Sequence, residues 1–241
     1  MPEPQALALP ATVVQHLLPD ADAAARALAG FVADALRDAL AARQSAQLLV
    51  SGGRSPLPFF AALSRQPLDW ARVRVGLVDE RCVAADSEDS NARAVRAHLL
   101  QNLAACADFQ PLYAAPLDAQ AAADAADARV AQWPRPFDVV VLGMGDDGHT
   151  ASLFPQARGT AAGLDPQTQR SVVATYPTTA AHARLTLTRR ALLGTRCLIL
   201  AIQGERKRAV LEAAALGAET AAPIAAFVHQ PVPPLQLFYN P

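Results

Sequence analysis

The segment Phe137–Leu142 constrains the fold of this sequence more than any other, because its apolar side chains fall on both faces of an extended chain. A strand that is buried on both faces is typical of the centre of a parallel sheet. Parallel neighbours cannot be joined by tight hairpins and need long crossovers, which are usually helices. Further strands are predicted at 47–50, 73–78, 172–176, 184–188 and 197–202, with a final edge strand at 235–239.

Helical patterns separate most of these strands. Between residues 20 and 43 apolar side chains recur on one stripe, and Asp20 is expected to cap the first turn. Ser55 is the expected N-cap of the next helix, with Pro56 at its first position. Three more segments have helical patterns: 90–103, 117–133 and 205–216. The alternation predicts a single α/β domain over residues 1–241, a layered parallel or mixed sheet with helices on both faces.

Composition excludes several classes of protein. Hydrophobic residues make up 52% of the 241 residues and charged residues 18%, which supplies a core and excludes a disordered chain. The formal net charge of −1 gives no broad basic face for nucleic acid or an anionic membrane. No apolar run approaches the roughly 20 residues of a membrane helix. The N-terminus lacks signal-peptide features and the three cysteines form no CxxC pair, so we expect a cytoplasmic protein with neither of these partners.

Four polar or glycine-rich segments each follow a predicted strand, at 51–56, 79–81, 143–149 and 204–207. The carboxyl ends of parallel strands meet at one edge of a sheet, where open α/β sheets bind their ligands. We therefore expect these four segments to converge on one site.

The first segment contains Gly52, Gly53, Arg54 and Ser55. Two glycines let the backbone approach a ligand, and the following helix N-terminus offers free N–H groups and a positive dipole end. Arg54 adds a cation, so the segment suits a phosphate, although it is not a Walker A loop. A tight turn with an exposed arginine remains an equal alternative.

The loop 143–149 matches the pattern GxGxxG, which on its own is weak evidence for a dinucleotide site. Phe154 and Pro155 stop any helix within two turns, which disfavours that interpretation. The alternative is a glycine loop that presents Asp147 and His149. Histidine titrates near neutral pH and suits a general acid or base, so His149 is the leading catalytic candidate.

Other charged residues are candidates for binding. Asp79 and Arg81 end a predicted strand, where they could hold a hydroxyl and a carbonyl or carboxylate, or form only a surface ion-pair cluster. Arg184 and Lys207 are further cations on later elements, and Lys207 in the first turn of a helix is mildly unfavourable with the dipole unless an anion binds there. No GxSxG elbow and no metal-binding motif is present in the sequence.

Taken together, the segments 51–56, 79–81, 143–155, 184–188 and 204–207 resemble the 6-phosphogluconolactonase family. The related glucosamine-6-phosphate deaminases share an Asp-Gly-His loop but carry an acidic residue where this chain has Phe154. A deaminase or isomerase is therefore the alternative function. A non-catalytic sugar-phosphate sensor is a second alternative, which the neutral charge and the lack of a DNA-binding segment disfavour.

The resemblance implies a three-layer Rossmann-like fold of the NagB/RpiA type and hydrolysis of 6-phospho-D-glucono-1,5-lactone in the oxidative pentose phosphate pathway. It implies a sugar-phosphate lactone as the partner, no metal and no organic cofactor. We expect a monomer or weak homo-oligomer. It implies His149 as general base, with Asp79, Arg81 and Asp147 around the reacting end. Phosphate contacts are implied for the 52–55 loop, Arg184 and Lys207.

Overall fold

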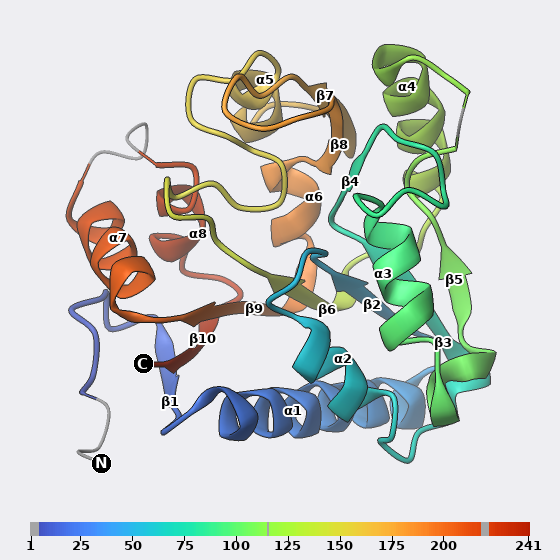
Figure 1. The fold of residues 1–241 in the computed structure, drawn as a ribbon. Helices are drawn as coiled ribbons and strands as arrows, with labels where there is room; N and C mark the ends of the chain where they lie inside the picture. The colour runs from blue at the N-terminus through green and yellow to red at the C-terminus, as the bar shows by residue number, and fades with distance from the viewer. Residues whose placement is uncertain (1–4, 115, 218–221) are drawn as a thin grey trace.

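The computed structural model describes residues 5–114, 116–217 and 222–241, and it confirms the expected α/β fold (Figure 1). Within these residues, seven parallel strands form the main sheet. Their order across the sheet is β1 (Val14–Leu17), β10 (Leu235–Asn240), β9 (Thr195–Gln203), β6 (Phe137–Leu142), β2 (Ala46–Val50), β3 (Val73–Leu77) and β5 (Asp108–Gln110).

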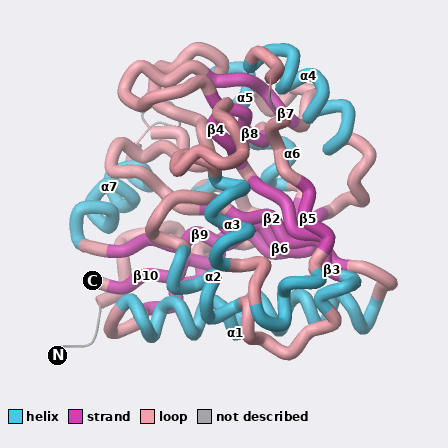
Figure 2. Tube along the Cα trace, turned by 45° about the vertical axis from the view of Figure 1, so that its right-hand side comes forward, coloured by secondary structure: helices cyan, strands magenta, loops and turns pink. Residues whose placement is uncertain are grey.

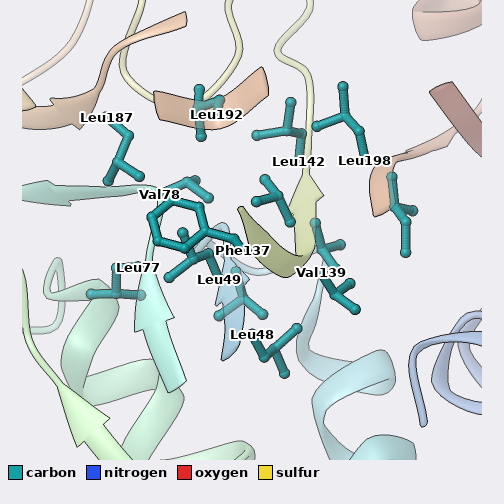
Figure 3. Packing of buried hydrophobic residues seen from close by; sticks show 14 of the residues in the cluster. Leu48, Leu49, Leu77, Val78, Phe137, Val139, Leu142, Leu187, Leu192 and Leu198 are labelled. Carbon is teal, nitrogen blue, oxygen red and sulfur yellow. The ribbon is translucent and has the colours of Figure 1, made fainter. Parts of the chain in front are cut away.

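The two central strands, β2 and β6, are buried at every residue. Their apolar side chains pack on both faces of the sheet, where Figure 3 shows Leu48, Leu49 and Phe137 gathered at its centre. The polar residue of β6, Asp138, accepts a hydrogen bond from the backbone of Gln47 at 2.8 Å and pairs with an arginine. The apolar pattern of 137–142 therefore predicted the sheet centre correctly.

Helices cover both faces of this sheet. The long helix α1 (Ala21–Ala42) lies beneath it, capped by Asp20 as expected, while α6 (Arg189–Leu193) and α8 (Ala225–Val228) lie above it (Figure 1). Figure 2 shows α1 beneath the strands from a second direction. The other helices are α2 (Leu57–Leu63), α3 (Asn91–His98), α4 (Ala119–Val130), α5 (Thr160–Leu164), α7 (Glu205–Leu216) and the 3₁₀ helices at Trp70–Arg72 and Asn102–Cys106.

A second, antiparallel sheet contains three strands: two that the sequence pattern predicted without separating them from the main sheet, and one, at 79–81, that it did not predict. They are β4 (Asp79–Arg81), β8 (Arg184–Leu187) and β7 (Val172–Thr175). The prediction that Asp79 and Arg81 end the preceding strand is therefore wrong. The chain changes sheets at Val78, whose N–H donates to Val50 in β2 while its carbonyl accepts from Leu187 in β8.

Two further expectations about local structure are wrong. Ser55 does not cap α2, since Pro56 occupies the N-cap position and no side chain caps that helix. The strand β10 is interior, because the short strand β1, which the sequence pattern did not reveal, pairs with its outer side. Among the described helices, none is both long and apolar enough to cross a membrane.

The core packing gives a stability prediction. Leu49 in β2 is fully buried, so Leu49→Ala is expected to lower the free energy of unfolding by about 2–5 kcal/mol. Leu103, which is 53% exposed, is the matched control. Leu103→Ala is expected to change the free energy of unfolding by less than about 0.5 kcal/mol. Urea titration monitored by circular dichroism measures both, and equal losses would contradict the assigned core.

Candidate functional site

The site lies where the strand order reverses. After β2 the chain continues to β3 and β5 on one side of the sheet, whereas after β6 it continues to β9 and β10 on the other. Loops that leave neighbouring strands in opposite directions open a crevice at the carboxyl ends of those strands. In this chain the crevice lies between the 51–56 loop after β2 and the 143–149 loop after β6.

A cavity of about 330 Å³ occupies this position. Most of the predicted site residues line it, and they come from four separate segments: Gly52, Gly53, Arg54, Ser55, Asp79, Arg81, His149 and Lys207. Asp147 and Arg184 are predicted site residues that do not line the cavity. The expected convergence of the four loops is thus confirmed, while the roles of the individual residues stay predictions.

Ser51 ties the two central loops together. Its hydroxyl donates to the carbonyl oxygen of Val141 at 3.2 Å and accepts from the N–H of Gly143 at 3.1 Å. Its backbone N–H also donates to Val141 at 3.0 Å. These bonds hold the start of the 143–149 loop beside the 51–56 loop, so the two walls of the cavity are fixed relative to each other.

The imidazole of His149 is oriented by Asp147. Its Nδ1 lies 2.5 Å from Asp147 Oδ1, and its backbone N–H donates to the same oxygen at 3.1 Å. Burial raises the pKa of Asp147, but the hydrogen bonds from His149 outweigh burial, so the pKa lies below its ordinary value. An ionised carboxylate accepts only, so Nδ1 is the donor in this hydrogen bond, and in the neutral form of the ring Nε2 is the nitrogen without a proton.

Two neighbours fix the plane of this ring. Phe154 stacks on it, with ring centroids 4.0 Å apart and an interplanar angle of 23°. Gly145 is the second neighbour, since a Cβ atom added there would lie 2.2 Å from His149 Nδ1 and 2.9 Å from Asp147 Oδ1. The glycine at 145 is therefore needed for close packing against the histidine–aspartate pair.

Asp79 is held by a network of buried groups. Its Oδ2 accepts a hydrogen bond from the hydroxyl of Ser152 at 2.6 Å. The backbone N–H of Ser152 in turn donates to Thr186 Oγ1 at 3.2 Å. Asn91 Nδ2 donates to the carbonyl oxygen of Asp79 at 2.9 Å. The carboxylate of Asp79 therefore has a fixed position in the cavity wall, and it is connected to the loop that carries His149.

Glu80 has a structural role that the sequence did not indicate. Its buried carboxylate accepts backbone N–H groups of Arg81, Asn91 and Ala92, each at 2.7 Å. Burial raises the pKa of Glu80, while these three hydrogen bonds lower it and the charge of Asp79 raises it further, leaving it above the ordinary value. Glu80 thus attaches the first turn of α3 to β4.

The two arginines of the small sheet face each other across β4 and β8. Arg81 and Arg184 are register partners, and Arg81 donates to the backbone carbonyl of Asp89. Burial, followed by the charge of Arg81, lowers the pKa of Arg184. Arg184 donates to the carbonyl oxygen of Ala181 at 2.9 Å, and its guanidinium lies 5.9 Å from the ring centroid of Phe154.

Several residues at the site were missed by sequence reasoning. Asn91 lines the cavity, and a Cβ atom at Gly52 would lie 2.0 Å from its Oδ1. Gly52 is therefore required by close contact with a protein side chain, in addition to any contact with a ligand. Ser51 and Ser152 were also missed. Each is one small polar residue inside a recognised segment, and nothing in the linear sequence gives its distant partner.

The site brings a histidine, cations and fixed hydrogen-bond acceptors together in one cavity. Burial, followed by the charge of Glu80, raises the pKa of Cys82 to about 11, so its thiol is protonated at neutral pH and is no activated nucleophile. Within the described residues, His, Cys, Asp and Glu side chains form no group of three or more that could hold a metal ion. The arrangement suits attack by water on an anionic substrate, with His149 Nε2 taking the proton.

Comparison with known proteins agrees with this geometry. The model of the family described as glucosamine-6-phosphate isomerases/6-phosphogluconolactonase matches residues 19–233. A 6-phosphogluconolactonase from Pseudomonas aeruginosa is 47% identical over 227 residues, 94% of this chain and 95% of that protein. The crystal structure of a 6-phosphogluconolactonase from Shewanella baltica has a TM-score of 0.92 at 42% identity, covering 98% of this chain and 100% of that chain. A monomeric glucosamine-6-phosphate deaminase shares the fold, with a TM-score of 0.77 at 16% identity, over 95% of this chain and 97% of its own.

The contact at Gly145 gives a direct test of the site geometry. Gly145→Ala is expected to displace the imidazole of His149 from Asp147, because the new methyl group would overlap the ring. The short Nδ1–H hydrogen bond should give a low-field proton NMR signal in the native protein that is lost in the variant. Gly30→Ala, where a Cβ meets nothing within 4 Å, is the control and should keep the signal. An unchanged signal in Gly145→Ala would contradict the described packing.

Proposed function

The chain belongs to the family of glucosamine-6-phosphate isomerases and 6-phosphogluconolactonases, and on this premise we propose that its cavity hydrolyses 6-phospho-D-glucono-1,5-lactone with His149 as general base. It is a lactone-hydrolysing enzyme by its near-complete, 47% identical match to a 6-phosphogluconolactonase. The observation that carries the proposed mechanism is the Asp147–His149 hydrogen bond at the wall of a cavity that cations also line.

The proposed reaction has two proton transfers. Nε2 of neutral His149 takes a proton from a water molecule as that water attacks the lactone carbonyl, and Asp147 stabilises the imidazolium through Nδ1. The ring C–O bond of the tetrahedral intermediate then breaks, and His149 gives its proton to the departing ring oxygen. Arg81, or backbone N–H groups of the glycine loops, holds the oxyanion meanwhile, and one such donor is worth on the order of 3 kcal/mol.

The phosphate of the substrate is assigned to the side of the cavity formed by the 52–55 loop and Lys207. Gly53 has a φ of +91°, a backbone conformation that favours glycine, and it turns the loop between β2 and α2. Lys207 lies in the first turn of α7, so an anion there meets both the ammonium group and the helix dipole. Arg184 does not line the cavity, so the geometry gives no support to its predicted phosphate contact.

Phe154 opposes a deaminase function for this site. The related deaminases are expected to carry an acidic residue at this position, whereas here the aromatic ring of Phe154 stacks on His149. An assay for ammonia release from glucosamine 6-phosphate, with negligible release expected, decides between the two functions. Within this proposal the enzyme works in the oxidative pentose phosphate pathway of the cytoplasm, as a monomer or weak homo-oligomer, without metal or organic cofactor.

Removal of the base tests the mechanism. His149→Ala is expected to lower kcat by about 10²–10⁴-fold with KM little changed, because general base assistance is lost while the phosphate contacts remain. The substrate is made in place with glucose-6-phosphate dehydrogenase, and each rate is corrected for spontaneous hydrolysis. Native activity in the variant would overturn the assignment of His149.

Removal of the proposed phosphate cation has a different expected signature. Lys207→Ala should raise KM by roughly 10-fold or more with a smaller effect on kcat, since it removes a charged hydrogen bond to the substrate. Arg206→Ala is the matched control, because Arg206 is on the same turn but lies outside the cavity and pairs with Asp146 at 3.3 Å. The same KM in the Lys207 variant and the native enzyme would place the phosphate elsewhere.

A further inference from the structure

One face of the small antiparallel sheet carries an acid, two arginines and two threonines. Alternate residues of a strand share a face of the sheet, and so do residues that lie directly opposite each other on neighbouring strands. By this rule five side chains point to the same side: Asp79 and Arg81 of β4, Arg184 and Thr186 of β8, and Thr175 of β7. One carboxylate and two guanidinium groups are therefore neighbours on this face.

Ser152 lies on the same face and is held there by the two threonines. Its backbone N–H donates to Thr186 Oγ1 at 3.2 Å, and its carbonyl oxygen accepts from the hydroxyl of Thr175 at 2.8 Å. All three residues are at most 1% exposed. Because its backbone is fixed in this way, Ser152 has its hydroxyl directed at Asp79, to which it donates at 2.6 Å.

The two arginines of this face have no acid partner. Each has a buried Nε without a hydrogen-bond acceptor, and in the part of the chain that the structure describes no carboxylate lies within ion-pair distance of either guanidinium. Burial, followed by the charge of Arg81, lowers the pKa of Arg184, while the nearby charge of Asp79 raises it. The carboxylate of Asp79 is thus close to the arginines, yet a serine hydroxyl engages it.

This choice of partner needs an explanation, because a guanidinium is the stronger partner for a carboxylate. Hydrogen bonds between two ionised groups are roughly twice as strong as those between neutral groups. Arg81 lines the cavity, where it is one of the proposed donors to the oxyanion. A guanidinium that is already paired with a carboxylate has less positive charge and fewer free N–H groups to offer an oxyanion.

We infer that Ser152 is a positioning residue, whose hydroxyl holds the carboxylate of Asp79 away from Arg81 and so keeps that guanidinium available to the substrate. This inference rests on the proposed function, and of the two proposed kinds of oxyanion donor it commits to Arg81. The segment 149–154 then contributes to the reaction in two ways, since it presents His149 and also controls the partner of Asp79.

The experiment removes the serine hydroxyl in the presence and in the absence of the carboxylate. We measure kcat and KM on the lactone, corrected for spontaneous hydrolysis, for the native enzyme, Ser152→Ala, Asp79→Ala and the double variant. Ser152→Ala should lower kcat by roughly tenfold or more, with a smaller effect on KM, because Asp79 turns to Arg81 and weakens an oxyanion donor. In Asp79→Ala no carboxylate remains to pair with Arg81, so adding Ser152→Ala should cause almost no further loss.

Ser64→Ala is the matched control. Ser64 is also a fully buried serine, its hydroxyl donates to the carbonyl oxygen of Ala61 at 3.0 Å, and it lies outside the cavity. Both serine variants lose a buried hydrogen bond and should unfold at lower urea concentrations than the native enzyme, but Ser64→Ala should keep the native kcat. A native kcat in Ser152→Ala, or the same fold loss with and without the Asp79 carboxylate, would overturn the inference. Absence of native turnover with the lactone would instead overturn the proposed function.

An NMR measurement tests the pairing itself. The Nε–H signal of Arg81 should shift in Ser152→Ala, because the guanidinium gains a carboxylate acceptor, and should keep its position in Ser64→Ala. Ser152→Cys, whose thiol is a weaker donor, takes the place of Ser152→Ala in both experiments if the alanine variant does not fold. An Arg81 signal at its native position in the folded Ser152 variant would also overturn the inference.

Discussion

The burial of β2 and β6 on both faces is the constraint on which the rest of the structure depends. Two adjacent, fully buried parallel strands need helices on both sides, and their connections here run in opposite directions across the sheet. The crevice at their carboxyl ends follows from that topology. Ser51 then joins the two strand ends through its hydroxyl, so loops 90 residues apart in sequence act as one rigid wall.

The chemistry of the site is built from this wall by short-range contacts. A glycine at 145 lets the His149 ring approach Asp147, and Phe154 covers one face of the ring. Asp79 is reached from the same loop through Ser152, although it belongs to a different sheet. His149, the proposed base, and the fixed carboxylate of Asp79 are thus both positioned by one continuous segment, while the cations come from the ends of other elements. Such preorganisation lowers the cost of orienting the groups during the reaction.

The features that could be predicted from the sequence are local ones. Asp147 and His149 are two residues apart in a glycine loop, and the apolar run 137–142 identifies a central strand without any knowledge of its neighbours. The errors concern tertiary pairing. The interior position of β10 depends on β1, a short strand of four residues, and the change of sheet at Val78 depends on hydrogen bonds to two distant strands. Asn91 lies far in sequence from Gly52, so only the fold reveals why that glycine is needed.

The central claim is that Asp147 and His149 act as one unit in lactone hydrolysis. A double-mutant cycle with Asp147→Asn and His149→Ala tests it most directly, with kcat measured on the lactone after correction for spontaneous hydrolysis. Because Asp147 is expected to act through His149, the double variant should be no slower than His149→Ala alone. Losses that multiply, so that Asp147→Asn slows the His149→Ala enzyme as much as it slows the native enzyme, would contradict the account.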